Sequence, residues 1–295
     1  MSRAGPLLVV GRSGQLAHAL VQAGRDDVIA LGRPDLDLCD ARSVKRALTQ
    51  HNPALVINAA AYTAVDKAEA DEAAAMALNA EGPAALAALC ADQGCPLIHV
   101  STDYVFDGTA QRPYRETDPC VPLGVYGRSK HAGEVAIAGA HRHHIIVRTA
   151  WVYSDTGHNF VKTMLHMARD RDGISVVKDQ FGNPTFAPHL AEALLHMADH
   201  IKADPGFDAW GIYHLAGQGQ ASWADLAMEV FKVSKALGGP TAMVVPIPGT
   251  DYPTPAARPA NSCLDGDKAK AVFDVALPDW RDGVKTCVQS LLRDA

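Results

Sequence analysis

Short aliphatic runs alternate with longer Ala-rich segments through the first half of this chain. The aliphatic runs predict buried strands at 7–10, 28–31, 55–58, 97–101 and 145–149. The segments between them predict helices at about 15–23 and at 41–50, 67–92 and 129–138. This alternation is typical of a parallel sheet that is covered by helices on both faces.

The regular pattern ends near Thr156, and prolines then divide the chain into short segments. We therefore expect a sheet domain over residues 1–155, with segments around 185–218 packing back onto it. Residues 156–295 are expected to form mainly a smaller second domain that closes over the ligand crevice.

Composition and charge narrow the class of protein. The chain has 295 residues, 48% of them hydrophobic, which is enough for a full α/β core and a smaller second unit. A net charge of −6 argues against a nucleic-acid partner.

We see no apolar segment near the roughly 18 residues of a membrane span. The first strand explains the N-terminal apolar run better than a signal peptide does. The six cysteines lack C-x-x-C spacing, so we expect reduced thiols and a cytoplasmic protein without a membrane partner.

A glycine turn follows the first predicted strand. Gly11, Gly14 and Ala17 have the spacing G-x-x-G-x-x-A, and a helix begins within the turn. Free N–H groups and the helix dipole would meet a pyrophosphate there. The ligand crevice of such a sheet lies at the carboxyl ends of its strands, where residues 59–63, 101–104 and 149–153 also fall.

Three polar side chains are predicted to converge near this crevice. Tyr126 and Lys130 are four residues apart, on one face of a helix, and Thr102 lies at the end of the preceding strand, directly after the predicted range 97–101. A phenol, an ammonium and a hydroxyl beside a dinucleotide can deliver a proton during reduction of a ketone. The Lys130 ammonium would lower the pKa of the phenol, about 10 in isolation, by roughly 1–3 pH units.

Several segments, in order through nearly the whole chain, resemble the extended short-chain dehydrogenase/reductases, and among them the dTDP-4-dehydrorhamnose reductase family. These segments are 11–15, 58–66, 101–108, 126–130, 148–153, 179–185 and 258–262. The resemblance implies a Rossmann-type, doubly wound parallel sheet with a smaller C-terminal α/β substrate domain. It also implies reduction of the 4-keto group of dTDP-4-dehydro-L-rhamnose to dTDP-L-rhamnose by NAD(P)H, a step toward lipopolysaccharide or cell-wall polysaccharide.

The resemblance further implies roles for individual residues. Tyr126 would be the proton donor, Lys130 would also bind the nicotinamide ribose, and Thr102 would hold the substrate oxygen. Asp103 and Trp151 would contact the sugar. Cofactor contacts are expected from Gly11, Gly14, Gln15, Leu16, Arg33, Asp40, Ala41, Ala61, Tyr62, Thr63, Tyr126 and Lys130.

Arg33 follows the second strand, where a basic residue favours the 2′-phosphate of NADPH. Asp35 and Asp37 follow closely, so NADH stays possible. Some members of the family form dimers through magnesium held by glutamates. The corresponding positions here fall near Ala19, Pro188 and Ser290, so we expect no metal and a monomer or weak homodimer.

Two other functions fit the same residues. A nucleotide-sugar 4-epimerase would use Tyr126 and Lys130 with tightly bound NAD. A regulatory subunit like that of methionine adenosyltransferase would bind the cofactor without turnover, although the intact Thr102, Tyr126 and Lys130 argue against it.

Overall fold

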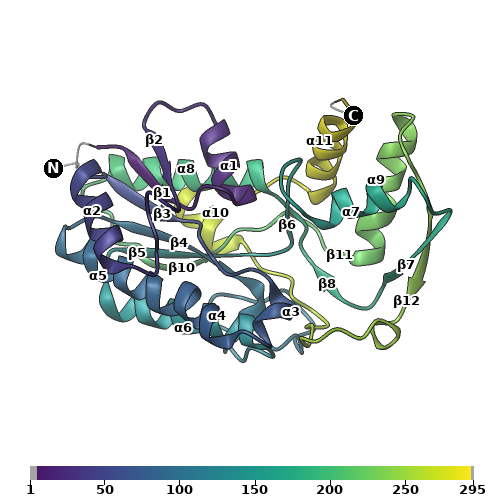
Figure 1. The fold of residues 1–295 in the computed structure, drawn as a ribbon, viewed down its shortest axis with the longest axis horizontal. Coiled ribbons are helices and arrows are strands. Elements are labelled where there is room, and N and C mark those ends of the chain that lie inside the picture. Colours follow the sequence, from purple (N-terminus) through teal and green to yellow (C-terminus); the bar gives the residue numbers. More distant parts are fainter. Residues whose placement is uncertain (1–4, 294–295) are drawn as a thin grey trace.

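Six parallel strands form the main sheet of the computed structural model, which describes residues 5–293 (Figure 1). The order is β10-β5-β4-β3-β1-β2. The strands are β1 (Leu7–Val10), β2 (Val28–Leu31), β3 (Leu55–Asn58), β4 (Leu97–Thr102), β5 (His144–Thr149) and β10 (Gly211–His214). The predicted Rossmann-type parallel sheet is therefore confirmed. Residues 1–4 and 294–295, which belong to the two expected domains, lie outside the described range.

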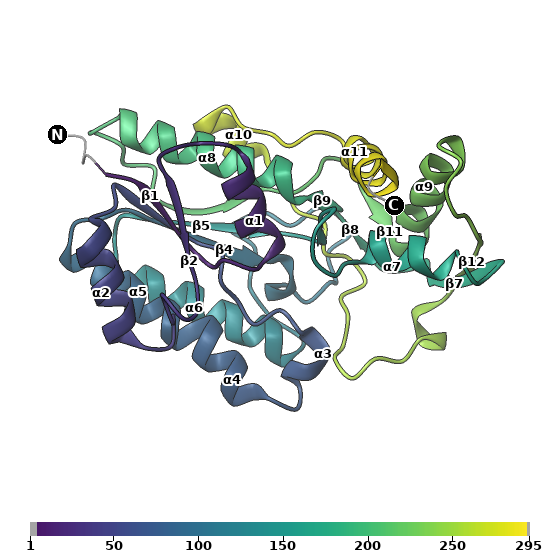
Figure 2. The same cartoon turned by 45° about the horizontal axis from the view of Figure 1, so that its top comes forward.

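Helices cover both faces of this sheet, as Figure 2 shows. Alternate residues of β1, such as Leu7 and Val9, face a core shared with α1 (Gln15–Gln22), α8 (Ala187–Ala203) and α10 (Asp267–Phe273). Leu8 and Val10 face the opposite core, which contains residues of α2 (Ala41–His51), α5 (Gly82–Asp92) and α6 (Val125–Ala140). Both faces of β1 are thus buried, which explains why all of its residues are aliphatic.

The single helix expected over 67–92 is wrong. The structure has α3 (Val65–Ala68), α4 (Glu72–Met76), a π-helix η1 (Ala77–Glu81) and then α5. Asp71 has a non-helical backbone (φ −136°, ψ 52°) and separates α3 from α4. The π turn carries Asn79 over α6, where a Cβ on Gly133 would lie 2.1 Å from the Asn79 carbonyl oxygen.

The expectation that no segment reaches the length of a membrane span is also wrong. Glu72–Asp92, 21 residues long, is apolar enough to cross a membrane by length and composition alone. In the fold this stretch packs against α6, and its α5 part also packs against α2. Leu86, Ala87 and Cys90 are buried in the core of the sheet domain. The hydrophobicity of the stretch is explained by this packing.

The C-terminal part has a core of its own, built from α7 (Phe160–Met167), α9 (Trp223–Ala236) and α11 (Trp280–Arg293). Three two-stranded sheets accompany these helices. They pair β6 (Val152–Tyr153) with β9 (Thr185–Phe186), β8 (Phe181–Gly182) with β11 (Ala221–Ser222), and β7 (Gly173–Val177) with β12 (Met243–Ile247). The chain between residues 185 and 218 contributes α8 and β10 to the main sheet domain.

A buried ion pair attaches α6 to β5. Glu134 and Arg148 are each 2% exposed at their side chains. Arg148 donates from Nε and Nη2 to the two oxygens of Glu134, at 3.0 and 2.7 Å. Burial raises the pKa of Glu134, but hydrogen bonds from His131 and Arg148 outweigh it and lower the pKa to about 2.

We predict that Glu134→Gln lowers the free energy of unfolding by about 3–5 kcal/mol at neutral pH, because Arg148 loses its buried counter-charge. The effect should shrink as the pH falls from 4.5, the ordinary pKa of a glutamate, toward about 2, because wild-type Glu134 then becomes neutral. Urea unfolding at both ends of that range measures it.

The matched control is Glu229→Gln, which removes a pair with the exposed Lys232 and should cost no more than about 1 kcal/mol. Equal stability of Glu134→Gln and wild type at neutral pH would contradict the importance of the buried pair.

Candidate active site

The crevice lies where the chain leaves β1 and β3. Strand β1 has β2 on one side and β3 on the other, so successive connections leave in opposite directions. Gly11 has φ +117°, and a Cβ there would lie 3.2 Å from the amide nitrogen of Ala60. Gly14 is the N-cap of α1, and a Cβ on it would meet nothing within 4 Å. The open space at this helix N-terminus fits the phosphates of a dinucleotide.

Asn79 holds the loop that follows β3. Its Oδ1 accepts from the N–H of Tyr62 at 2.7 Å, and its Nδ2 donates to the carbonyl of Tyr62 at 3.0 Å. The same amide donates to the hydroxyl of Ser129, which in turn donates to the carbonyl of Tyr126. The loop with Ala61, Tyr62 and Thr63 is therefore tied to α6.

Thr102, Asp103 and Tyr126 come together at the end of β4. The Thr102 hydroxyl donates to Oδ1 of Asp103 at 3.0 Å and accepts from the N–H of Tyr104 at 3.2 Å. Burial raises the pKa of Tyr126 to about 12; a hydrogen bond with Thr102 lowers it, and the Asp103 charge raises it further. The phenol is therefore protonated at neutral pH, as a proton donor must be.

Lys130 is fully buried, and its amino group points into β4. The Nζ atom lies 2.7 Å from the carbonyl oxygen of Val100 and 3.2 Å from Nε2 of His99. Burial lowers the pKa of Lys130 to about 8, although the charge of Glu134 raises it. The expectation that Lys130 lowers the pKa of Tyr126 is wrong for this arrangement, because burial dominates the pKa of the phenol.

Asp103 is a buried carboxyl group, 1% exposed, in the small helix η2 (Asp103–Val105). Burial raises its pKa to about 7, against the lowering effect of hydrogen bonds with Ser262 and Thr102. At neutral pH a large share of the molecules thus carry Asp103 as an uncharged acid, which can donate a hydrogen bond.

Trp151 joins the sheet domain to the C-terminal part. Its backbone has φ +46°, and its ring stacks on Trp223 of α9 with centroids 3.6 Å apart and planes 4° apart. Gly182 lies under the same ring, where a Cβ would come within 2.5 Å. Packing against Trp223 and Gly182 therefore accounts for the position of the Trp151 ring, and its contact with a sugar stays a prediction.

The other expected cofactor residues lie at the beginnings of α1 and α2. Oε1 of Gln15 accepts from Asn159 at 2.9 Å, and the side chain of Leu16 is buried in the sheet core. Asp40 caps α2, which begins at Ala41, by accepting from the N–H of Arg42.

Arg33 is exposed after β2. Sequence reasoning missed Arg12, whose Cβ would lie 2.9 Å from a Cβ on Gly32 and whose Nη1 lies 3.1 Å from Oδ2 of Asp35. Arg12 thus lies beside the residue that follows β2, and Arg33 is the next residue along the chain. The sequence could have indicated Arg12 as a candidate, because it directly follows Gly11, the first glycine of the turn.

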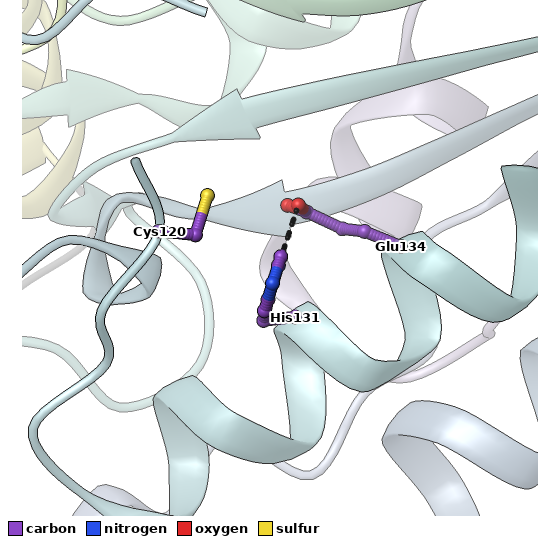
Figure 3. Close-up of side chains that lie close together, drawn as sticks. All are labelled: Cys120, His131 and Glu134. Carbon is purple, nitrogen blue, oxygen red and sulfur yellow. Dashed lines mark hydrogen bonds and ion pairs between the residues drawn. The ribbon is translucent and has the colours of Figure 1, made fainter. Parts of the chain in front are cut away.

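Cys120, His131 and Glu134 bring three possible metal ligands within 4.8 Å of one another (Figure 3). Both oxygens of Glu134, however, accept hydrogen bonds from Arg148, whose Nη2 also lies 3.1 Å from the sulfur of Cys120. The guanidinium already supplies the positive charge that these groups attract, and it would repel a metal ion.

The glycine turn after β1, with Tyr126 and Lys130 on a helix beside the end of β4, is the arrangement of the extended short-chain dehydrogenase/reductases. Residues 5–293 match the family model "RmlD substrate binding domain". The chain belongs to that family.

Named relatives agree with this assignment. The dTDP-4-dehydrorhamnose reductase of Sinorhizobium fredii is 45% identical over 97% of both chains. That of Burkholderia thailandensis is 42% identical over 97% of this chain and 99% of its own. A crystal structure of dTDP-4-dehydrorhamnose reductase from Bacillus anthracis in complex with NADP has a TM-score of 0.89 and 30% identity. It covers 97% of this chain and 99% of its own.

We predict that Asp103→Asn is more stable than wild type above pH 7. The folded protein raises the pKa of Asp103 from 3.8 to about 7, so wild type loses stability as the pH rises through this range. The neutral amide has no such loss. Urea unfolding at about pH 4.5 and about pH 8 measures the difference, which should favour the variant only at the higher pH. A difference that is the same at both pH values would show that Asp103 has an ordinary pKa.

Proposed function

We propose that this enzyme reduces the 4-keto group of dTDP-4-dehydro-L-rhamnose, giving dTDP-L-rhamnose, with NADPH as hydride donor. The observation that carries the proposal is the convergence of Thr102 and Tyr126 at the end of β4, in a sheet whose first strand leads into the open N-terminus of α1. The relatives named above are reductases of this sugar nucleotide, and the match extends over both domains.

Tyr126 is proposed to donate the proton. NADPH supplies the hydride, and the carbonyl oxygen that receives negative charge must then be protonated. The Tyr126 phenol holds its proton at neutral pH and hydrogen-bonds to Thr102. Thr102 is proposed to hold the substrate oxygen, and Asp103 and Trp151 to contact the sugar. A donor aimed at developing charge stabilises the transition state because it needs no reorganisation.

Cofactor binding is proposed for the residues that line the glycine turn and the loop after β3. Gly11, Gly14, Gln15 and Leu16 would face the pyrophosphate, and Lys130 would bind the nicotinamide ribose. Asp40 and Ala41 would contact the adenine. The loop of Ala61, Tyr62 and Thr63 would line the nicotinamide side.

NADPH is favoured because Arg33, shortly after β2, is exposed and can meet a 2′-phosphate, whereas the Asp35 carboxylate forms an ion pair with Arg12. NADH stays possible, since the Arg12–Asp35 pair is exposed and weak.

A cytoplasmic monomer or weak homodimer is proposed for the assembled enzyme. Ser290, near one position that holds magnesium in some family members, donates to Asp155 at 2.8 Å. Ala19 is a buried core residue and Pro188 lies in the first turn of α8, so these three side chains supply no carboxylate. The net charge of −6 gives no attraction for nucleic acid.

Purified protein should oxidise NADPH when dTDP-4-dehydro-L-rhamnose is added, with a lower KM for NADPH than for NADH. Arg33→Ala should raise the KM for NADPH far more than that for NADH, because it removes binding to the 2′-phosphate. Arg142→Ala, an exposed arginine before β5, is the control and should change neither. Absence of turnover with either cofactor would overturn the proposed reaction.

Tyr126→Phe should lower kcat by about 10²–10⁴, the usual contribution of general acid catalysis. The ring and its packing are kept, so the Kd for NADPH should stay near that of wild type. Thr102→Val should cost less, roughly 2.7–4 kcal/mol at most in transition-state stabilisation. Rapid-mix kinetics with fluorescence binding separates the two quantities. Near-normal turnover of Tyr126→Phe would mean that another group delivers the proton.

A further inference from the structure

His99, in β4, lies between Lys130 of α6 and Asn58 of β3. The imidazole is completely buried, and each of its nitrogens faces a nitrogen of another side chain. Nδ1 lies 3.0 Å from Nδ2 of Asn58 at the end of β3, and Nε2 lies 3.2 Å from Nζ of Lys130. Burial lowers the pKa of His99 well below 6.5, so the ring is neutral. A neutral imidazole carries one proton, and its other nitrogen is an acceptor.

The backbone decides which nitrogen of His99 carries the proton. The N–H of Ala60 donates to Oδ1 of Asn58 at 3.1 Å. A backbone N–H is only a donor, so the amide oxygen of Asn58 must face Ala60 and its NH₂ must face His99. Nδ1 of His99 therefore accepts from Asn58, and the ring proton lies on Nε2, directed at Lys130.

The nitrogen of Lys130 then meets a donor. An ammonium group has three N–H donors and no lone pair, so it would oppose the Nε2–H of His99. A neutral amine can accept from Nε2–H while it donates to the carbonyl of Val100 at 2.7 Å. We propose that Asn58 and His99 are positioning residues whose hydrogen-bond chain favours the uncharged amine of Lys130. This inference rests on the proposed function, in which Tyr126 donates the proton, and adds to it a role for Lys130 in returning that proton.

Besides this chain, burial and the charge of Glu134 act on the pKa of Lys130. Glu134, on the same helix, attracts a charged Lys130, but it is already paired with Arg148 of β5. Tyr126 is a protonated phenol, and Asp103 in η2 is neutral in a large share of molecules at pH 7. Burial already lowers the pKa of Lys130 to about 8. The ammonium form of Lys130, which a pKa of about 8 leaves populated at neutral pH, can give one proton to the Tyr126 phenolate after turnover. The uncharged amine that results is the form that the chain stabilises, and it then takes a proton back from solvent.

The charge state of Lys130 can be measured directly by the pH dependence of its ¹³Cε chemical shift. The protein is labelled with ¹³C-lysine and studied without cofactor, and Lys130→Arg assigns the signal. Asn58→Leu removes the donor to Nδ1 without adding charge, so the ring proton can move to Nδ1 and Nε2 can accept from an ammonium. The titration midpoint of Lys130 should then rise by about one pH unit, which corresponds to the gain of one hydrogen bond to a charged group.

Asn58→Asp should raise the midpoint further, because its carboxylate accepts from Nδ1–H and adds negative charge. His99→Gln, whose amide oxygen can accept from an ammonium, gives the same test should Asn58→Leu fail to fold. His141→Gln is the matched control, since His141 is a buried histidine at the opposite end of the sheet, bonded to the carbonyl of Cys95. It should leave the Lys130 midpoint unchanged.

An unchanged or lower midpoint in Asn58→Leu and His99→Gln would overturn the proposal. If the midpoint rises, the alkaline limb of the kcat/KM profile for NADPH-dependent reduction should move with it. A raised midpoint with an unmoved pH profile would support the hydrogen-bond chain and refute the proposed role of Lys130 in the reaction. The titration of Lys130 thus tests the hydrogen-bond chain, and the kinetic pH profile tests the role of Lys130 in the reaction.

Discussion

The buried contact between Glu134 and Arg148 is the constraint on which the site depends. Tyr126, Lys130 and Glu134 follow one another at intervals of four residues, so they share one face of α6. The ion pair holds the third of these positions against β5, and the other two are then presented to the end of β4. Rotation of α6 about its axis would separate Glu134 from Arg148 and leave two buried charges unpaired, so the ion pair fixes which face of the helix meets the sheet.

Much of the fold follows from the hydrophobic pattern alone. The strands β1, β2 and β3 lie where their aliphatic runs predict, because strands of a sheet that helices cover on both faces need apolar residues at most positions. The stretch 67–92 was not predictable in the same way. Its alanines favour a helix throughout, but the backbone departs from helical geometry at Asp71. The contacts of Asn79 with Tyr62 and Gly133, which accompany the π-helix, are formed only in the tertiary structure.

The residues of the site likewise include some that were predictable from the sequence and some that were not. Helix geometry is local, so the shared face of Tyr126 and Lys130 was predictable from their spacing. The partners of Lys130 were not, because Asn58 and His99 are brought to it by strand pairing between distant segments. Their only signal in the sequence was the presence of a polar residue within an otherwise aliphatic run. The stack of Trp151 on Trp223 likewise required the packing of two domains.

The position of β10 has a consequence for synthesis of the protein on the ribosome. The strand that pairs with β5 begins at Gly211, long after β5 ends at Thr149, and α8 covers a face of the sheet from within the same interval. At translation rates of about 5–20 residues per second, the nascent sheet waits roughly 3–12 s for its last strand. During that time it has an unpaired edge and an uncovered apolar face, which are features that chaperones bind. The N-terminal half is therefore a poor fragment to express alone, although it carries Tyr126 and Lys130.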